Sequence, residues 1–303
     1  MLSKRIRFQL SMLITFMFSF VSIHPVFAEN SLIPDKNLEQ AIRLELKKPT
    51  GAITKKDLAS LTSLYADDPE QKVASIAGLE YAVNMESLML PGLGITNIEP
   101  VKNLRKVTFL ALNSNQITDL EPLQGMKQLE QLVIDENSVD KLDALSGLTN
   151  LTDLLIGHNQ IKDLSPIQTL TKLNWLIIND NEIQSLEPLR NHPNLEYLYI
   201  DNNQIQDISV LTSLPNLKEV SLSNNPLNAN SDGILAKLTN KGVKIMNDEE
   251  DQTETLITPS VQFDEIPVMP NTKANGLHYL SYLRNGSVLI PFILILEFLG
   301  MYN

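Results

Sequence analysis

Residues 151–172 read LTDLLIGHNQIKDLSPIQTLTK, and residues 173–194 read LNWLIINDNEIQSLEPLRNHPN. Both 22-residue stretches carry leucine or isoleucine at their first, fourth, sixth, eleventh and fourteenth places and asparagine at their ninth. The chain therefore contains one structural unit that is repeated at a fixed interval. Further units of the same kind start at Met85, Val107, Leu129, Leu195 and Leu217.

A single unit of this length cannot enclose its own apolar side chains, so successive units must stack and bury them against one another. The alternation around Leu154 and Ile156 predicts a short strand in each unit, and strands of successive units would pair in parallel about 4.8 Å apart. The ninth-place asparagines are interpreted as a structural ladder that binds buried backbone groups. The pattern L-x-x-L-x-L-x-x-N predicts leucine-rich repeats, which form an α/β solenoid.

Residues 1–28 have the features of a secretory signal peptide. Three basic residues precede an apolar run from Leu10 to Val21, and Val26-Phe27-Ala28 resembles a cleavage site of the small-x-small kind. The apolar run is shorter than the roughly 20 residues that a membrane-spanning helix needs. We therefore expect the chain to be exported.

The charge and the cysteine content exclude some classes of function. The formal net charge is −12, and it becomes −15 without residues 1–28, which hold three of the 24 basic residues and no acidic one. An acidic surface repels nucleic acid, so we expect no nucleic-acid partner. The chain has no cysteine, so its stability must come from the stacked core rather than from disulfides.

Both ends of the repeat array need caps, because an open end would expose apolar core and an unpaired sheet edge. Residues 32–66 are predicted to form a helical N-terminal cap, in which Asp35 begins one helix and Thr54 with Asp57 begins another. Leucine-rich repeats are assigned to residues 61–230, with a degenerate first coil. A closing helix and a last strand in residues 231–246 form a short C-terminal cap.

The caps and repeats together resemble the internalin family of bacterial surface proteins. The resemblance rests on 22-residue units with the return segment N-x-I-x-D-[IL]-x-P-L, preceded by IPDKNLEQAI at residues 33–42 and AITKKDLASLTSLYA at residues 52–66. It implies a curved right-handed solenoid that is secreted or held on the bacterial cell surface. It also implies that the concave parallel sheet binds a protein on another cell, such as a host cell-surface protein.

The segment after the array departs from that family, whose members usually continue with an immunoglobulin-like domain and a wall-attachment signal. Residues 247–279 are predicted to be an acidic, proline-containing linker, and residues 280–303 an apolar tail. An immunoglobulin-like domain needs about 100 residues, more than remain here. The tail lacks an L-P-x-T-G motif. Residues 287–302 are a candidate for membrane association; packing on the array and an origin by truncation are the alternatives.

Strand alternation points the third, fifth and seventh places of each unit toward the concave side of the sheet. These places combine large apolar side chains, including the only tryptophan of the chain, with an acidic rim to which Asp135 belongs. An exposed aromatic patch with a charged rim is typical of a protein-binding hot spot. The predicted binding residues are Phe109, Val133, Asp153, Leu155, Trp175, Ile177, Tyr197, Tyr199, Asp201 and Glu219.

Catalysis has little support in this sequence. The histidines are scattered, and the sequence contains no H-x-x-x-H pair, G-x-S-x-G elbow or phosphate-binding loop. We expect a monomer that is not an enzyme, with no catalytic residue, no metal and no cofactor. Two other hypotheses remain open: the aromatic face binds a carbohydrate or a cell-wall polymer, or the chain is a truncated internalin-like protein without its downstream domains.

Overall fold

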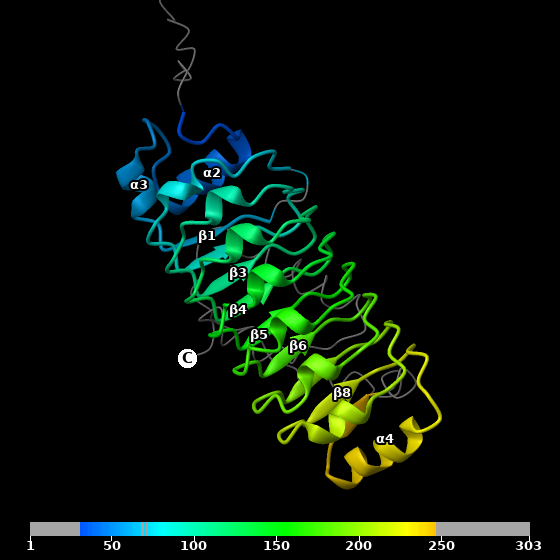
Figure 1. Ribbon diagram of the computed structural model, residues 1–303. Helices are drawn as coiled ribbons and strands as arrows, with labels where there is room; N and C mark the ends of the chain where they lie inside the picture. The colour runs from blue at the N-terminus through cyan, green and yellow to red at the C-terminus, as the bar shows by residue number, and fades with distance from the viewer. Residues whose placement is uncertain (1–30, 68–69, 71, 247–303) are drawn as a thin grey trace, which may run out of the picture. The chain divides into compact units, whose positions relative to one another are not determined.

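The computed structural model describes residues 31–67, 70 and 72–246. The predicted signal peptide, linker and apolar tail lie outside these residues. Within the described part, short strands form one parallel sheet in chain order, from β1 to β9 (Figure 1). The strands are β1 (Ser63–Tyr65), β2 (Ser87–Met89), β3 (Phe109–Ala111), β4 (Gln131–Val133), β5 (Asp153–Leu155), β6 (Trp175–Ile177), β7 (Tyr197–Tyr199), β8 (Glu219–Ser221) and β9 (Lys244–Met246).

Each coil returns through a short 3₁₀ helix on the side opposite the sheet. Proline is the second residue of four of these helices, where its fixed φ suits the turn and its missing N–H leaves no bond unmade. The 3₁₀ helices are η1 (Leu79–Tyr81), η2 (Glu99–Val101), η3 (Glu121–Leu123), η4 (Asp143–Leu145), η5 (Ser165–Ile167), η6 (Glu187–Leu189) and η7 (Ser209–Ser213).

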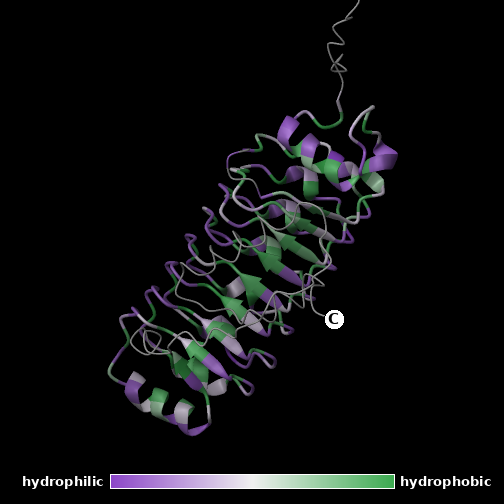
Figure 2. Cartoon of the chain, turned by 180° about the vertical axis from the view of Figure 1, so that it is seen from behind, coloured by the Kyte–Doolittle hydropathy of each residue, from purple (hydrophilic) through white to green (hydrophobic). Residues whose placement is uncertain are grey.

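The core is a continuous stack between the sheet and the 3₁₀ helices. Leu154 pairs in register with Leu176, which pairs with Leu198, and all three side chains are fully buried. Figure 2 shows the hydrophobic residues following the row of strands, while the loops at the edges of the coils are mostly hydrophilic. Burial of each large apolar side chain contributes roughly 1.5–3 kcal/mol, so the stack supplies the stability that a chain without disulfides needs.

The chain leaves the sheet at the eighth place of each unit in a left-handed conformation. From Gly92 to Asn224 this place has φ values between 50° and 71°. Its N–H donates to the seventh-place carbonyl of the next coil, as the His158 N–H does to the Asn179 oxygen at 2.8 Å. The pairing of neighbouring coils therefore continues beyond the three-residue strands, while the backbone turns sharply.

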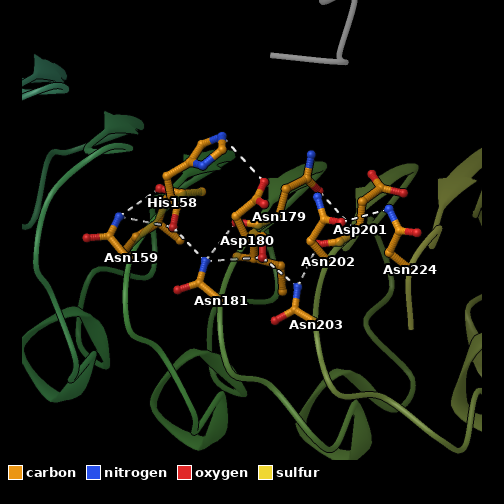
Figure 3. A network of polar contacts seen from close by, with 12 residues as sticks. His158, Asn159, Asn179, Asp180, Asn181, Asp201, Asn202, Asn203 and Asn224 are labelled. Carbon is orange, nitrogen blue, oxygen red and sulfur yellow. Dashed lines mark hydrogen bonds and ion pairs between the residues drawn. The ribbon is translucent and has the colours of Figure 1, made fainter. Parts of the chain in front are cut away.

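The ninth-place asparagines bind the backbone of this turn on both sides. Asn181 Oδ1 accepts from the Ile161 N–H at 2.9 Å, and its Nδ2 donates to the carbonyl oxygens of Ile156, Ile178 and Asn179 at 3.0–3.2 Å. Figure 3 shows Asn159, Asn181 and Asn203 in one such row. The first unit has Leu93 instead, and there the Val73 N–H donates to the Leu93 carbonyl oxygen at 2.9 Å.

Helices close both ends of the array. At one end lie α2 (Lys36–Glu45) and α3 (Lys55–Ala59), and at the other α4 (Ser231–Asn240) (Figure 1). Asp35 accepts from two N–H groups of α2 through Oδ1 and from the Ala74 N–H through Oδ2, which fastens the cap to the first coil. The capping box of Thr54 and Asp57 is present at α3.

The prediction of an α/β leucine-rich repeat solenoid with a parallel sheet is therefore confirmed, and helices stand where both caps were expected. The closing helix and last strand expected in residues 231–246 correspond to α4 and β9. None of the helices in the described part is long and apolar enough to cross a membrane.

The asparagine ladder makes a direct prediction about stability. Replacing Asn181 by alanine should reduce the free energy of unfolding by about 1–3 kcal/mol, because the buried Ile161 N–H loses its partner and three C=O groups each lose one of their two donors. Urea denaturation measures the change.

Asn150→Ala is the matched control, since the bond from Asn150 Nδ2 to the Lys127 carbonyl oxygen is solvent-exposed. The control should cost less than about 1 kcal/mol. Equal losses in the two variants would show that the ladder is not a main source of stability.

Candidate protein-binding site

The third and fifth places of the strands meet on the concave face, which is the face of the sheet turned away from the core. Trp175 pairs in register with Tyr197, and Ile177 pairs with Tyr199, so four large side chains occupy adjacent positions on β6 and β7. The rings of Trp175 and Tyr197 stack with their centroids 4.4 Å apart and an interplanar angle of 18°. The Tyr199 ring lies 6.1 Å from that of Trp175.

These side chains form a hydrophobic cluster separate from the core. Its buried members are Trp175, Ile177 and Tyr199, and Leu155 of β5 and Tyr197 pack against them. We call these five residues the aromatic cluster. Stacked aromatic pairs contribute about 0.5–1.5 kcal/mol beyond the burial of their surface, so ring stacking adds to the stability of the cluster.

The sequence predicts that the five side chains of this patch are exposed, and for three of them that expectation is wrong. Trp175, Ile177 and Tyr199 are only 5%, 8% and 4% exposed. Large side chains at equivalent places in adjacent coils lie one strand spacing apart and cover one another. Of the other predicted apolar residues, Val133 is buried on β4 beside Leu155 but is not a member of the cluster, and Phe109 is half-buried on β3.

The acidic residues of the rim have donors within the fold. The Tyr199 hydroxyl donates to Glu219 Oε1 at 2.5 Å, and Lys244 Nζ lies 3.8 Å from the other oxygen of Glu219. Burial, followed by the bond to Glu219, raises the pKa of the Tyr199 hydroxyl well above its usual range. Asp153 Oδ2 accepts from Gln131 Nε2 at 3.0 Å and from the Thr152 hydroxyl at 2.6 Å.

Asp201 is also tied into the fold. Its Oδ1 accepts from the Ser221 hydroxyl at 2.6 Å and from the Ser223 N–H at 2.7 Å, and its own N–H donates to Asn179 Oδ1 at 3.1 Å. Only 9% of Asp201 is exposed. This carboxylate therefore orders the edge of the concave face and has less capacity for a partner than the sequence suggested.

Asp135 differs from the other acidic residues of the rim. Its Oδ1 is buried and has no hydrogen-bond partner among the described residues, and neither has Oδ1 of Asn113 on the neighbouring coil. Burial, with a smaller effect from the charge of Glu136, raises the pKa of Asp135 to about 7. Sequence reasoning missed Asn113, although it holds the same seventh place as Asp135, one unit earlier.

A second polar row borders the concave face at the eighth place (Figure 3). His158 Nε2 lies 3.4 Å from Asp180 Oδ2, and Asn224 Nδ2 donates to Asn202 Oδ1 at 2.8 Å. Each contact joins neighbouring coils, so polar side chains at the rim are paired with one another. In the described part of the chain, no three His, Asp or Glu side chains are grouped so that they could hold a metal ion.

Comparisons with known proteins agree with this architecture. The family model described as "Leucine rich repeat" matches residues 105–161, and "Leucine Rich repeats (2 copies)" matches residues 171–213 and 193–236. A crystal structure of internalin C2 from Listeria monocytogenes is 36% identical, with a TM-score of 0.53, over 63% of this chain and 95% of that one. No curated protein sequence matches the chain.

A crystal structure of a second internalin from Listeria monocytogenes, InlF, is 27% identical to this chain. The match covers 72% of this chain and 92% of that one, with a TM-score of 0.34.

The raised pKa of Asp135 makes a prediction about stability and pH. Because the folded chain holds a proton on this carboxyl up to about pH 7, and the unfolded chain only to its ordinary value of 3.8, this contribution to stability falls as pH rises between those values. Asp135→Asn should therefore be more stable relative to the unchanged protein at pH 8 than at pH 4.5. We expect a difference on the order of 1–2 kcal/mol, because partial exposure screens the charge.

Urea denaturation at the two pH values measures this difference. Asp163→Asn is the control, because hydrogen bonds from Ser165 lower the pKa of Asp163, which keeps it ionised across the range. Its effect should be the same at both pH values. A pH-independent effect of Asp135→Asn would contradict the prediction.

Proposed function

The chain belongs to the internalin family of leucine-rich repeat proteins, and we propose from its concave face that it is an adhesion module that binds a protein on another cell. The aromatic cluster carries this proposal. The fold supports a protein-interaction module in general, and the cluster supplies the part of the surface that is suited to one ligand.

The repeat itself does not require aromatic residues on this face. The third place is Ser87, Gln131 or Asp153 in other coils, and the fifth place is Ala111 or Ser221. The same backbone register therefore accepts small and polar side chains at these places. The concentration of one tryptophan and two tyrosines on β6 and β7 supports a role in binding rather than in the solenoid.

The chemistry of the cluster suits a protein ligand. Tryptophan and tyrosine dominate the binding energy of protein interfaces, because they offer large rigid surfaces together with a polar group. Trp175 Nε1 is buried and has no acceptor among the described residues, so a carbonyl oxygen of a partner that reached it would satisfy an unpaired donor. Tyr197 remains partly exposed at the edge of the stack and is the first side chain that a partner would meet.

The charge of the module suits a basic or mixed partner surface. The whole chain has a net charge of −12, and the rim of the concave face is acidic. Such charges mainly accelerate association and select among partners, and salt screens their effect.

Export is part of the proposal. The features of residues 1–28 support secretion or display on the bacterial surface, where the concave face of a monomer meets a protein of a host cell. A protein ligand is favoured over a carbohydrate because the rings of the cluster stack on one another. Stacking leaves few ring faces open to sugars.

Binding of the purified protein to intact animal cells tests this function. Trp175→Ala and Tyr197→Ala should each weaken saturable binding by about 30-fold or more, which is the loss of roughly 2 kcal/mol expected for a hot-spot side chain. Treating the cells with protease before the assay should abolish binding of the unchanged protein.

Leu44→Ala is the control, since Leu44 is 67% exposed on α2, which lies beside β1 at the end of the sheet remote from β6 and β7, and its truncation should leave binding unchanged. Circular dichroism and melting temperature verify that each variant is folded. Absent binding, equal binding by all variants, or binding that survives protease treatment would contradict a concave-face adhesin for a protein receptor.

A further inference from the structure

The seventh places of successive coils form a row along one edge of the concave face. The same pair of residues, asparagine followed by aspartate in the next coil, occurs twice in this row. The row consists of Asn113, Asp135, Gly157, Asn179, Asp201 and Ser223.

The second pair is fully hydrogen-bonded. Asn179 Oδ1 accepts from the Asp201 N–H at 3.1 Å, and Asp201 Oδ1 accepts from the hydroxyl of Ser221 and the N–H of Ser223 at 2.6 and 2.7 Å. Figure 3 shows Asn179 and Asp201 side by side in this arrangement. The donors to Asp201 are a hydroxyl at the fifth place and a backbone N–H at the seventh place of the following coil, so only the fifth-place donor depends on the residue type.

The first pair lacks the side-chain donor. The coil after Asp135 has Leu155 at its fifth place, where the other pair has Ser221, and leucine has no hydrogen-bond donor in its side chain; the Gly157 N–H, unlike that of Ser223, does not donate to the carboxylate Oδ1. Oδ1 of Asn113 and Oδ1 of Asp135 are both buried and have no partner among the described residues, and Asn113 is only 5% exposed. A buried polar atom without a partner costs roughly 1–3 kcal/mol, a cost that a bound donor would remove.

The charges around this pair favour a cation. Glu136 follows Asp135 directly, and the Ser114 hydroxyl donates to Glu136 Oε2 at 2.8 Å, which holds the second carboxylate beside the pair. The charge of Glu136 and burial together raise the pKa of Asp135 to about 7. A positive group would relieve both the repulsion and the missing hydrogen bonds.

We propose that Asn113 and Asp135 form a subsite on the concave face that takes the basic side chain, lysine or arginine, of the protein partner. The inference rests on the proposed function and names a chemical property of its ligand. A guanidinium group has five N–H donors and an ammonium group three, so either can reach two acceptors on adjacent coils. Calcium requires six to eight oxygen ligands, more than this pair and Glu136 are suited to provide.

The position of the subsite fits a partner that also covers the aromatic cluster. Asp135 follows β4, and Trp175 lies on β6, with β5 between them. Two strand spacings separate the coils by about 10 Å, which is within the footprint of a single interface. The partner is therefore expected to present an apolar or aromatic anchor and, about 10 Å from it along the array, a basic side chain.

An NMR titration of the isotope-labelled full chain tests the subsite. The probe is N-acetyl-arginine methylamide, and its neutral counterpart is N-acetyl-citrulline methylamide at the same ionic strength and pH 8. The arginine probe should cause saturable shifts at the Asn113 side-chain amide, the Asp135 carboxyl carbon and the Gly157 N–H, and the citrulline probe should not. Asp135→Asn should weaken the binding at least about tenfold, because it removes the charged acceptor.

Asp163→Asn is the control, since Asp163 is an exposed carboxylate next to η5 that already accepts from the Ser165 N–H and hydroxyl, and it should leave the affinity for the probe unchanged. Equal shifts with both probes, or an unchanged affinity in Asp135→Asn, would overturn the subsite. Those results would leave the proposed function standing if Trp175→Ala still weakened cell binding. If the arginine probe bound as expected but Trp175→Ala did not weaken cell binding, the proposed function would be overturned instead.

Discussion

The structure depends on how each coil satisfies its backbone where the chain leaves the sheet. A three-residue strand followed by a left-handed residue turns the chain within a buried space, where peptide groups have no access to water. The ninth-place asparagine accepts from one N–H and donates to three carbonyl oxygens there, and it joins its own coil to the preceding one. Because this device repeats every 22 residues, the coils stack in one register.

That register separates two sets of side chains with different tasks. Leu154, Leu176 and Leu198 face inward and carry the stability of the array. The third, fifth and seventh places face the other side, where the fold accepts serine, glutamine, aspartate, alanine or tryptophan. Selection can therefore change the concave face without cost to the core. The aromatic cluster on β6 and β7 and the acceptor pair of Asn113 and Asp135 are two local uses of this freedom, one apolar and one charged.

The sequence predicted the fold well because periodicity determines it directly. Local pattern and spacing predict that Leu154 points into the core and Leu155 away from it. They also predict the asparagine ladder and the capping box at Thr54. The exposed fraction of the side chains on the concave face could not be predicted from the pattern, because the extent to which Trp175 and Tyr199 cover one another depends on the orientation of their rings. The different states of Asp135 and Asp201 also escaped prediction. The side-chain donor to Asp201 lies 20 residues further on, at Ser221, whereas the residue 20 places after Asp135 is Leu155.

Site-specific photo-crosslinking tests the central claim, that the concave face meets a protein, most directly. A photoreactive phenylalanine analogue would replace Tyr197 in one protein and the exposed Gln168, beside η5 on the opposite side of the array, in another. On intact animal cells, the account predicts a covalent adduct with a cell-surface protein from position 197 and none from position 168. Adducts from position 168 alone, or from neither position, would contradict it.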